Sequence, residues 1–392
     1  MKPQRSRNPE TPNTETPKKK LRFFFILGRN PELSRAEILA YLQARNRTHK
    51  EILFNENILI IETDDNEKFN IQEFGGTVHF GKITFEGNQQ ELKKYLNKTE
   101  IIPSDKFSYG MFGNESPETL KEIFKKRKKK ATQKHGKNQI KFQDGKKQEF
   151  PKADFYILFH STSPNTYHLT PNPSSSARVY LGIATQTYNN EEVKKRDMQK
   201  PVRRESLAIS PRLSKILINL SGAKPHTLML DPFCGIGGIL QEALIKKINV
   251  YGIDKDKQAT IDAEQNLKWL IKQYKINSTY KIENKDARNS PDLQFFAIAT
   301  ETPLGKTLRK KPNDNEAKQI IQNFEAYIIP ILKKLKKVKK PSAKIAITFP
   351  VVKVFHTDAK KIAEKTDLKI HTNPILESRE DQNISRDIIV LQ

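Results

Sequence analysis

The chain is predicted to contain a C-terminal α/β domain with a doubly wound, largely parallel sheet, preceded by an N-terminal α+β domain. From residue 210 onwards, short apolar runs typical of strands alternate with longer segments of helical periodicity, as in a parallel sheet with crossover helices. Before residue 189, strand-like runs dominate and helical stretches are few. A chain of 392 residues is long enough for two domains that each bury a core.

The N-terminal region is expected to begin with a disordered tail, residues 1–20, which is rich in Pro, Thr, Asn and Lys. A buried strand, LRFFFILG (21–28), precedes a helix in which Ser34 is a suitable N-cap and Glu37 completes a capping box. Further elements are expected as strands at 56–63, 153–160 and 177–189, and as a helix, a Gly-Gly break and a strand within 69–83.

Positive charge is concentrated in a basic insert near residues 115–150 and contributes to a net charge of +25. Such an excess fits either a lysine-rich solvated surface or a polyanionic partner such as nucleic acid. The insert itself is equally compatible with a solvated loop and with an arm that lies along phosphates. The predicted domains are therefore 21–188, which contains this insert, and 210–392, joined by a charged connector at 189–209.

The C-terminal region begins with a helix in which Pro211 suits the first turn and Gly222 closes the last one. Its other predicted helices are residues 237–247, 257–275 and 315–335, and its predicted strands are 227–231, 249–254, 278–287, 295–300 and 343–352. The tail from residue 367 is expected to pair as a terminal hairpin.

Several classes of protein are excluded by composition. The single cysteine, Cys234, cannot build a disulfide framework or a cysteine metal site, and the eight histidines show no metal-binding spacing. No apolar run approaches the roughly 18–20 residues that cross a bilayer, and the N-terminus lacks the apolar segment of a secretory signal. A cytoplasmic protein is expected.

A glycine loop, LDPFCGIGGIL (230–240), follows the first strand of the C-terminal region. Doubly wound sheets bind ligands at the carboxyl ends of their strands, where glycines let the backbone approach a ligand and the next helix favours a negative group. Asp231, Asp254 and Asp286 each fall at the end of one of three successive strands.

Three interpretations of this loop compete. The glycines and aspartates could simply terminate strands, but all three acids fall at the same edge. A dinucleotide site would explain Asp254 as the ribose partner, yet the G-I-G-G spacing lacks a later glycine and Pro-Phe-Cys intervenes. An S-adenosylmethionine site needs an acid near the amino group, an acid for the ribose and a polar group near the adenine. Asp231, Asp254 and Asp286 fit these needs in order.

Three separate segments carry a family resemblance that covers most of the chain outside the tail and the basic insert. DPFCGIGGILQEAL (231–244) is similar to a cofactor loop DPFCG-[ST]-G-hhh-EA, FFFILGRNPELSRAEI (23–38) and FGGTVHFGKI (74–83) to an N-terminal region, and KRDMQKP followed by SPRLSKILINLSG to a linking stretch. The chain thus resembles the THUMP-domain RNA methyltransferases, especially the archaeal and eukaryotic tRNA guanosine N2-methyltransferases acting at position 10 and their bacterial relatives.

The resemblance implies a Rossmann-like class I methyltransferase sheet, a THUMP-like RNA-binding domain, S-adenosylmethionine as cofactor and tRNA or another structured RNA as partner. The matching cofactor residues are Asp231, Phe233, Gly235 and Gly237 for the methionine side, Asp254 for the ribose, and Asp286 with Ala287 for the adenine. Ile236 stands where the family has Thr or Ser, which removes a hydroxyl and leaves the backbone cradle.

The resemblance is weakest at residues 300–305, TETPLG, where the family has an Asp/Asn-Pro-Pro-aromatic motif. In that motif an acceptor side chain and a carbonyl bind the target amine, and the ring stacks on the flipped base. The residues at the four positions here are Glu301, Thr302, Pro303 and Leu304. Glu301 can still accept hydrogen bonds, but Leu304 cannot provide stacking worth about 1–3 kcal/mol per base.

The expected activity is methylation of an exocyclic base amine in structured RNA, most directly guanine N2 in tRNA. Two alternatives stay open. One is an amine-directed DNA methyltransferase with the same cofactor loop, against which the RNA-domain resemblance argues. The other is a non-catalytic RNA-binding protein that retains the fold, for which the altered segment at Glu301 argues.

Overall fold

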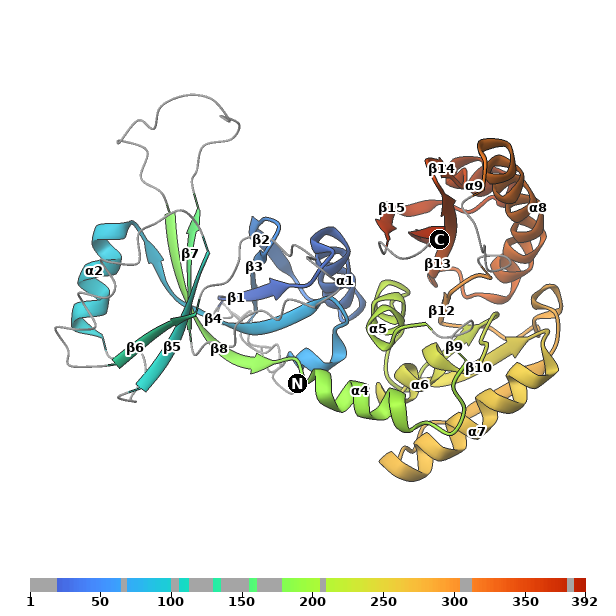
Figure 1. The fold of residues 1–392 in the computed structure, drawn as a ribbon, viewed down its shortest axis with the longest axis horizontal. Coiled ribbons are helices and arrows are strands. Elements are labelled where there is room, and N and C mark those ends of the chain that lie inside the picture. The colour runs from blue at the N-terminus through green and yellow to red at the C-terminus, as the bar shows by residue number, and fades with distance from the viewer. Residues whose placement is uncertain are drawn as a thin grey trace, which may run out of the picture.

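The computed structural model contains two mixed α/β parts arranged side by side, each organised around its own sheet (Figure 1). It describes residues 20–64, 69–99, 106–112, 130–134, 155–160, 178–204, 209–303, 312–378 and 384–392. The tail 1–19, most of the basic insert and Leu304 lie outside the described residues.

The N-terminal sheet has the strand order β2-β3-β1-β4-β8-β7-β5-β6. Its pairs are antiparallel, except that β5 runs parallel to both β6 and β7. The strands are β1 (Lys20–Leu27), β2 (His49–Phe54), β3 (Ile58–Asp64), β4 (Thr77–Gly87), β5 (Lys106–Phe112), β6 (Lys130–Lys134), β7 (Phe155–His160) and β8 (Arg178–Thr187); the helices are α1 (Pro31–Ala44) and α2 (Gln89–Lys98), with a 3-10 turn at Ile71–Glu73. The predicted α+β character is confirmed.

Aromatic side chains fill the core between β1, β4 and α1. Phe25 contacts Phe69 and Phe80 at ring-centroid distances of 5.3 and 5.0 Å, and Tyr41 of α1 contacts Phe74 at 4.6 Å. The alternating positions of the FFF run in β1 supply this face, because successive strand residues point to opposite sides of a sheet.

Helix α1 begins earlier than predicted, and its expected capping box is wrong. Asn30 is the N-cap and accepts a hydrogen bond from the Leu33 amide, while Ser34 is buried inside the first turn. Asparagine caps as well as serine does, and Pro31 after it suits the first helical position. Glu37 instead turns towards the segment before β4. The helix predicted around residue 70 is only the 3-10 turn.

The C-terminal sheet has the strand order β11-β10-β9-β12-β13-β16-β15, with β14 paired to β13. The five strands from β11 to β13 are parallel, and β16 runs antiparallel to both β13 and β15. The bounds are β9 (Leu228–Asp231), β10 (Asn249–Asp254), β11 (Tyr280–Asn284), β12 (Ala297–Thr300), β13 (Ile345–Val352), β14 (Phe355–His356), β15 (Ile370–Glu377) and β16 (Ile384–Leu391). The predicted doubly wound parallel sheet and the terminal hairpin are confirmed.

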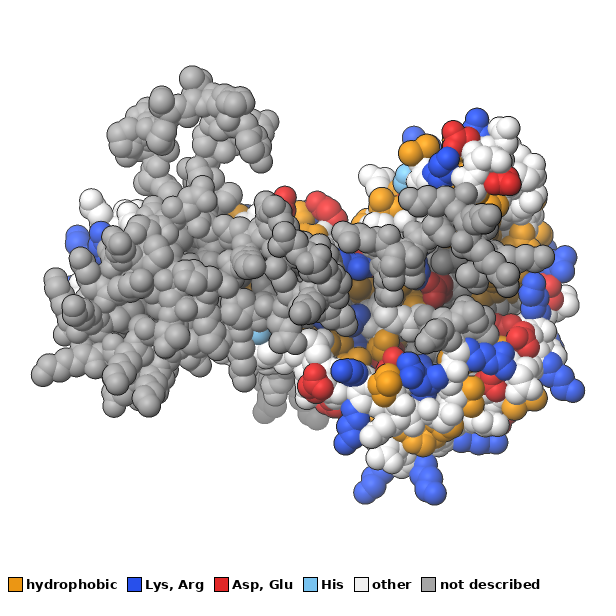
Figure 2. Space-filling view, in the orientation of Figure 1, with side chains coloured by type: hydrophobic (Ala, Val, Ile, Leu, Met, Phe, Trp, Pro, Cys, Tyr) orange, Lys and Arg blue, Asp and Glu red, His pale blue; other side chains and the backbone are white. Residues whose placement is uncertain are grey.

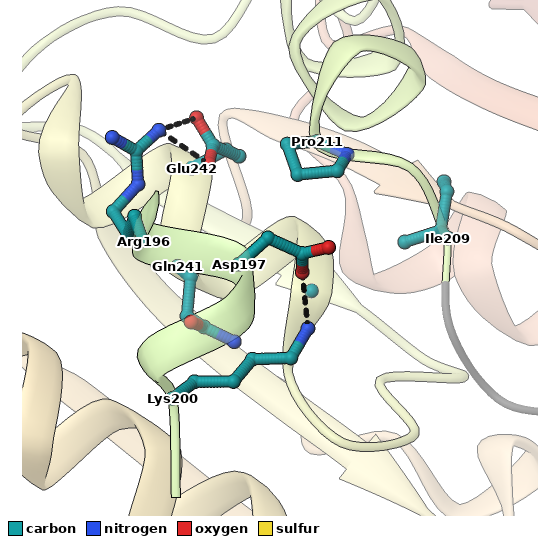
Figure 3. A pocket seen from close by; sticks show the side chains of 8 residues that line it. Arg196, Asp197, Lys200, Ile209, Pro211, Gln241 and Glu242 are labelled. Carbon is teal, nitrogen blue, oxygen red and sulfur yellow. Dashed lines mark hydrogen bonds and ion pairs between the residues drawn. The ribbon is translucent and has the colours of Figure 1, made fainter. Parts of the chain in front are cut away.

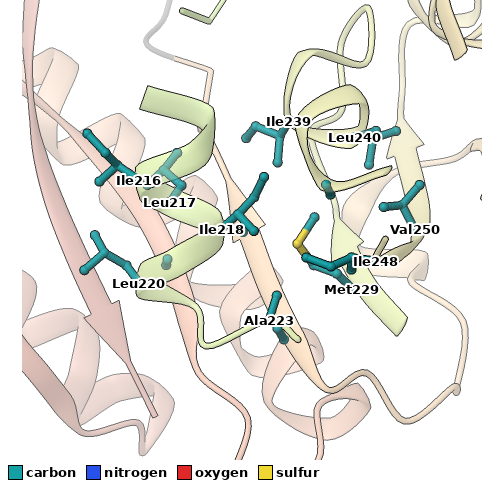
Figure 4. Packing of buried hydrophobic residues seen from close by; sticks show 14 of the residues in the cluster. Ile216, Leu217, Ile218, Leu220, Ala223, Met229, Ile239, Leu240, Ile248 and Val250 are labelled. Carbon is teal, nitrogen blue, oxygen red and sulfur yellow. The ribbon is translucent and has the colours of Figure 1, made fainter. Parts of the chain in front are cut away.

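Helices cover both faces of this sheet. One apolar cluster joins α5 (Pro211–Leu220), α6 (Gly238–Ile245) and α7 (Lys257–Tyr274) to one face, and Figure 4 shows its packing. A second cluster joins α8 (Asp314–Val338) and α9 (Ala359–Thr366) to the other face. Within the predicted connector, residues Asn190–Gln199 form the helix α4. No helix in the described ranges is long and apolar enough to cross a membrane.

The two parts meet where α1 packs against α5. The buried Glu37 carboxylate accepts hydrogen bonds from the amides of Gly75 and Gly76 at 2.7 and 2.8 Å and from Asn219 of α5 at 2.7 Å. Burial raises the pKa of Glu37, although these hydrogen bonds favour its ionised form. A Cβ on Gly75 would lie 1.9 Å from the Arg212 carbonyl oxygen, so only glycine allows this approach. The contacts fix the N-terminal part against α5.

Candidate cofactor and catalytic site

Four acidic residues line one edge of the C-terminal sheet. Asp254 and Asp231 end β10 and β9, Asp286 follows β11, and Glu301 follows β12. These strands are neighbours and parallel, so their carboxyl ends meet at one edge at intervals of about 4.8 Å. The expectation that three acids share this edge is confirmed, and Glu301 extends the row beyond them. We call these four residues the acid row.

The glycine loop is held against the acid row by backbone contacts. Gly235 and Gly237 have φ values of +50° and +84°, which L side chains rarely adopt. The Gly235 amide donates to Asp254 Oδ2 at 2.9 Å, and the Cys234 amide donates to the Ile253 carbonyl at 2.9 Å. Gly237 is the N-cap of α6 and has no side chain to cap its amides. Those amides can therefore face an acceptor on a ligand.

The side chains next to these glycines pack inside the protein. Ile236 is 1% exposed, so its departure from the family pattern lies inside the protein. Its carbonyl accepts a hydrogen bond from Asn266 of α7, which also bonds the backbone of Val202. Cys234, just before Gly235, is buried in the apolar cluster on one face of the sheet, and this burial raises the pKa of its thiol. Asn266 was not predicted, and its only signal in the sequence is that a polar residue falls on the apolar face of its helix.

Asp231 is 1% exposed and has a shifted pKa. Its Oδ1 accepts hydrogen bonds from Thr300 Oγ1 at 2.6 Å and from the Phe233 amide at 3.2 Å. Burial nevertheless raises the pKa of Asp231 to about 7, and the charges of Asp254 and Glu301 act in the same direction. A cationic ligand group at this position would stabilise the ionised carboxylate.

The far end of the acid row combines a charged pair with two aromatic rings. Both oxygens of Asp286 accept hydrogen bonds from Arg288, and this guanidinium lowers the pKa of Asp286 to about 2. Ala287, the next predicted cofactor residue, is buried. The ring centroids of Phe233 in the loop and Tyr327 of α8 lie 6.2 Å apart. Tyr327 was not predicted, because only the fold brings α8 to this edge.

The predicted acceptor segment lies next to Asp231 at the end of β12. Thr302 is 2% exposed; its amide donates to Thr348 Oγ1 at 3.1 Å and its hydroxyl to the Thr348 carbonyl at 2.6 Å. Pro303 is exposed, and Leu304 lies outside the described residues. The segment is thereby anchored to β13 through its second residue.

Glu301 forms an ion pair with Arg386 of β16. The side chains of Arg386 and Glu301 are only 10% and 19% exposed. Nothing in the sequence around residue 301 points to this partner, which lies 85 residues further on.

A small pocket beside the first turn of α6 does not belong to the acid row (Figure 3). Its charged side chains pair with one another: Arg196 donates to Glu242 at 2.8 Å, and Lys200 donates to Asp197 at 2.6 Å. The pocket thus marks where α4 is tied to α6. Across the described stretches of the chain, no group of three or more His, Cys, Asp or Glu residues could hold a metal ion.

Comparisons with known proteins found a matching domain family, related sequences and a similar solved structure. The family of RMKL-like methyltransferase domains matches residues 201–338. The tRNA (guanine(10)-N2)-dimethyltransferase of Pyrococcus abyssi is 24% identical over 353 residues, 88% of this chain and 92% of that protein. A protein of Methanothermococcus thermolithotrophicus described as "Probable tRNA (guanine(10)-N2)-dimethyltransferase" is 30% identical over 115 residues, 27% of this chain and 67% of that protein. TrmN from Thermus thermophilus, a solved structure, matches with a TM-score of 0.49 and 13% identity over 95% of this chain and 99% of that chain.

The parallel sheet, its glycine loop and the matched domain define a methyltransferase domain in the C-terminal half of the chain. The relatives carry the identification further, because the alignment with the first of them also spans the N-terminal part. The chain belongs to the tRNA (guanine(10)-N2)-dimethyltransferase family. The predicted family is therefore confirmed.

Proposed function

We propose that this protein transfers a methyl group from S-adenosylmethionine to guanine N2 in tRNA. The observation that carries the proposal is the acid row with the glycine loop beside it: three carboxylates for a cationic, ribose-containing cofactor and a fourth for the acceptor amine. The relatives named for guanine(10)-N2 methylation support the choice of base and of RNA.

The residues at the acid row fit the chemical groups of this cofactor. Asp231 would bind the ammonium of the methionine portion, with Phe233, Gly235 and Gly237 shaping the loop around it. The carboxylate of Asp254 would bind the ribose hydroxyls. Asp286 and Ala287 would contact the adenine. When bound, S-adenosylmethionine supplies a methyl group activated by its positively charged sulfur.

The acceptor amine would be held by the segment that follows β12. Glu301 would accept a hydrogen bond from the guanine amine, and backbone around Thr302 and Pro303 would accept a second one. These bonds orient the nitrogen for in-line attack, in which the new N–C bond forms as the methyl–sulfur bond breaks. No strong base is needed beforehand, because the amine nitrogen loses its proton once it is methylated.

The N-terminal region, 21–188, is proposed to bind tRNA, and 189–209 to connect it to the transferase domain 210–392. An excess of 70 Lys and Arg over 45 Asp and Glu favours a phosphate-rich partner. Figure 2 shows Lys and Arg scattered between acidic side chains over the visible face of the C-terminal part. Binding led by shape and phosphate contacts fits structured RNA. The protein is proposed to work in the cytoplasm.

The first test is calorimetry with S-adenosylmethionine on the wild type and on Asp254→Ala. We expect micromolar binding by the wild type and a loss of at least about tenfold in the variant, because two hydrogen bonds to a carboxylate are removed. Since Asp254 also accepts from the Gly235 amide, a thermal melt must show that the variant is folded. Mass spectrometry of nucleosides from treated tRNA would then identify N2-methylguanosine.

Two different results would contradict the proposed function. A folded wild type that does not bind the cofactor would contradict the enzyme and leave an RNA-binding protein. Binding followed by methylation of duplex DNA in preference to tRNA would favour the DNA methyltransferase instead.

A further inference from the structure

Glu301 lies at a partly buried edge of the sheet, near two other carboxylates. Its side chain is 19% exposed, and its charge acts on the buried Asp231 beside Asp254. A cation beside such neighbouring carboxylates offsets their mutual repulsion. Glutamate also has three side-chain torsions to restrict, so an unsupported Glu301 would not keep one orientation.

Arg386 supplies this cation and restricts the side chain of Glu301. Its guanidinium forms an ion pair with Glu301, and the whole residue is 8% exposed. A guanidinium so deep in the protein requires an anionic partner to offset its desolvation. Arg386 lies on β16, which is paired along its length with β13, the strand that also anchors Thr302 through Thr348. The cation is therefore mounted on the same rigid sheet as the acceptor segment.

The strand that carries Arg386 is also fixed from outside. The residue opposite Arg386 on β15 is Glu377. Glu377 forms an ion pair with Arg29 from the loop between β1 and α1. Asn30 of that loop donates to the Leu376 carbonyl at 2.8 Å. The N-terminal part thus contacts the hairpin directly beside the residue that holds Glu301.

We propose that Arg386 is a positioning residue for methyl transfer: its ion pair with Glu301 holds that carboxylate in the orientation needed to accept the substrate amine. This inference rests on the proposed function. It assigns to the terminal hairpin a role in the reaction, separate from that of the residues proposed to bind the cofactor.

The test compares Arg386→Gln, Arg386→Lys, Glu301→Gln and the double variant Glu301→Gln/Arg386→Gln on a set of unmodified tRNA transcripts. We expect Arg386→Gln to lower kcat on the order of tenfold to a hundredfold, as a displaced acceptor does, with KM for tRNA and the cofactor Kd each within about threefold. Arg386→Lys should recover part of kcat, because it restores the charge.

The double variant gives the sharpest readout. A neutral amide at position 301 needs no cation, so the double variant should have a kcat within about threefold of Glu301→Gln alone instead of the product of both losses. The matched control is Lys361→Gln, which breaks the Lys361–Glu325 ion pair (2.6 Å) on the helical layer of the same domain and should leave kcat unchanged.

Three results would overturn the proposal. A raised KM for tRNA with unchanged kcat would make Arg386 a tRNA contact. A loss of cofactor affinity parallel to kcat, or a double variant with fully additive losses, would make it a structural residue. A wild type that binds no cofactor and methylates no transcript would instead contradict the proposed function, which these variants do not test.

Discussion

The two ends of the acid row, the proposed cofactor end at Asp254 and the proposed acceptor end at Glu301, are built in different ways. The cofactor end is assembled by short-range contacts: the loop amide of Gly235 reaches Asp254 only 19 residues away. The acceptor end depends on distant strands, because Thr302 bonds Thr348, 46 residues away, and Glu301 pairs with Arg386, 85 residues away. A local cradle is encoded by one motif, whereas the acceptor end requires the complete sheet. Damage to the two ends should therefore have separable effects.

The largest expected effect is at the cofactor end. Gly237→Val forces a β-branched residue to φ +84°, which costs at least about 1–2 kcal/mol and displaces the loop. We expect a loss of cofactor affinity of more than about tenfold, measured by calorimetry. Gly222→Ala is the control, since Gly222 has φ +72° and nothing within 4 Å of an added Cβ. It should lower the melting temperature without changing the affinity; equal affinity losses in both variants would contradict the loop's role.

A pH dependence should follow from Asp231. Its pKa of about 7 means that the ligand-free protein holds this carboxyl protonated below neutral pH. An ammonium ligand requires the ionised form, so the affinity for S-adenosylmethionine should rise with pH up to about 7, by at most about tenfold per unit. Asp231→Asn should bind weakly with no such slope. Calorimetry between pH 5.5 and 8.5 checks both.

The same residue predicts a stability trend with the opposite sign. Because the folded pKa of Asp231 lies above the ordinary value of 3.8, its contribution to stability is complete at low pH and is lost as pH rises towards 7. The ligand-free Asp231→Asn variant should escape this loss, and thermal melts would detect the difference. For the preceding prediction on affinity, a wild type that binds S-adenosylmethionine equally well at every pH would rule out the contact between Asp231 and the ammonium group.

The smallest of the effects compared here is expected for the hydroxyl of Thr302. Thr302→Val removes the hydroxyl that donates to the Thr348 carbonyl at 2.6 Å, at a cost of about 1 kcal/mol in unfolding free energy. We expect kcat to fall severalfold while cofactor affinity stays within twofold, as assayed on tRNA transcripts and by calorimetry. Thr366→Val, which removes a hydroxyl bond inside α9 at 2.7 Å, is the stability-matched control and should keep kcat. A cofactor affinity that falls together with kcat would show that the two ends are not separable.

Sequence patterns determined the C-terminal sheet, its helices and the edge at which the acids gather. Strand and helix periodicities are local, and parallel strands bring their carboxyl ends together whatever the details of packing. The glycines at 235 and 237 were likewise readable, because the backbone conformation they permit is a property of single residues. The start of α1 was predicted wrongly because Asn30 and Ser34 are both suitable N-caps. Pro31, which favours the first position of a helix, makes Asn30 the N-cap in the structure.

Only the tertiary structure decided the partners of the buried charges. Glu37 was expected to cap its own helix, but it binds the Gly75–Gly76 amides and Asn219, and Glu301 was matched to a motif without its cation, Arg386. A buried charge must find a partner wherever the fold brings one within reach, and sequence separation carries no information about that. The sequence by itself thus determined the sheet edge at which the acids gather and the class of ligand that such an edge suits, while the packing of distant strands decided how Glu301 and Thr302 are held.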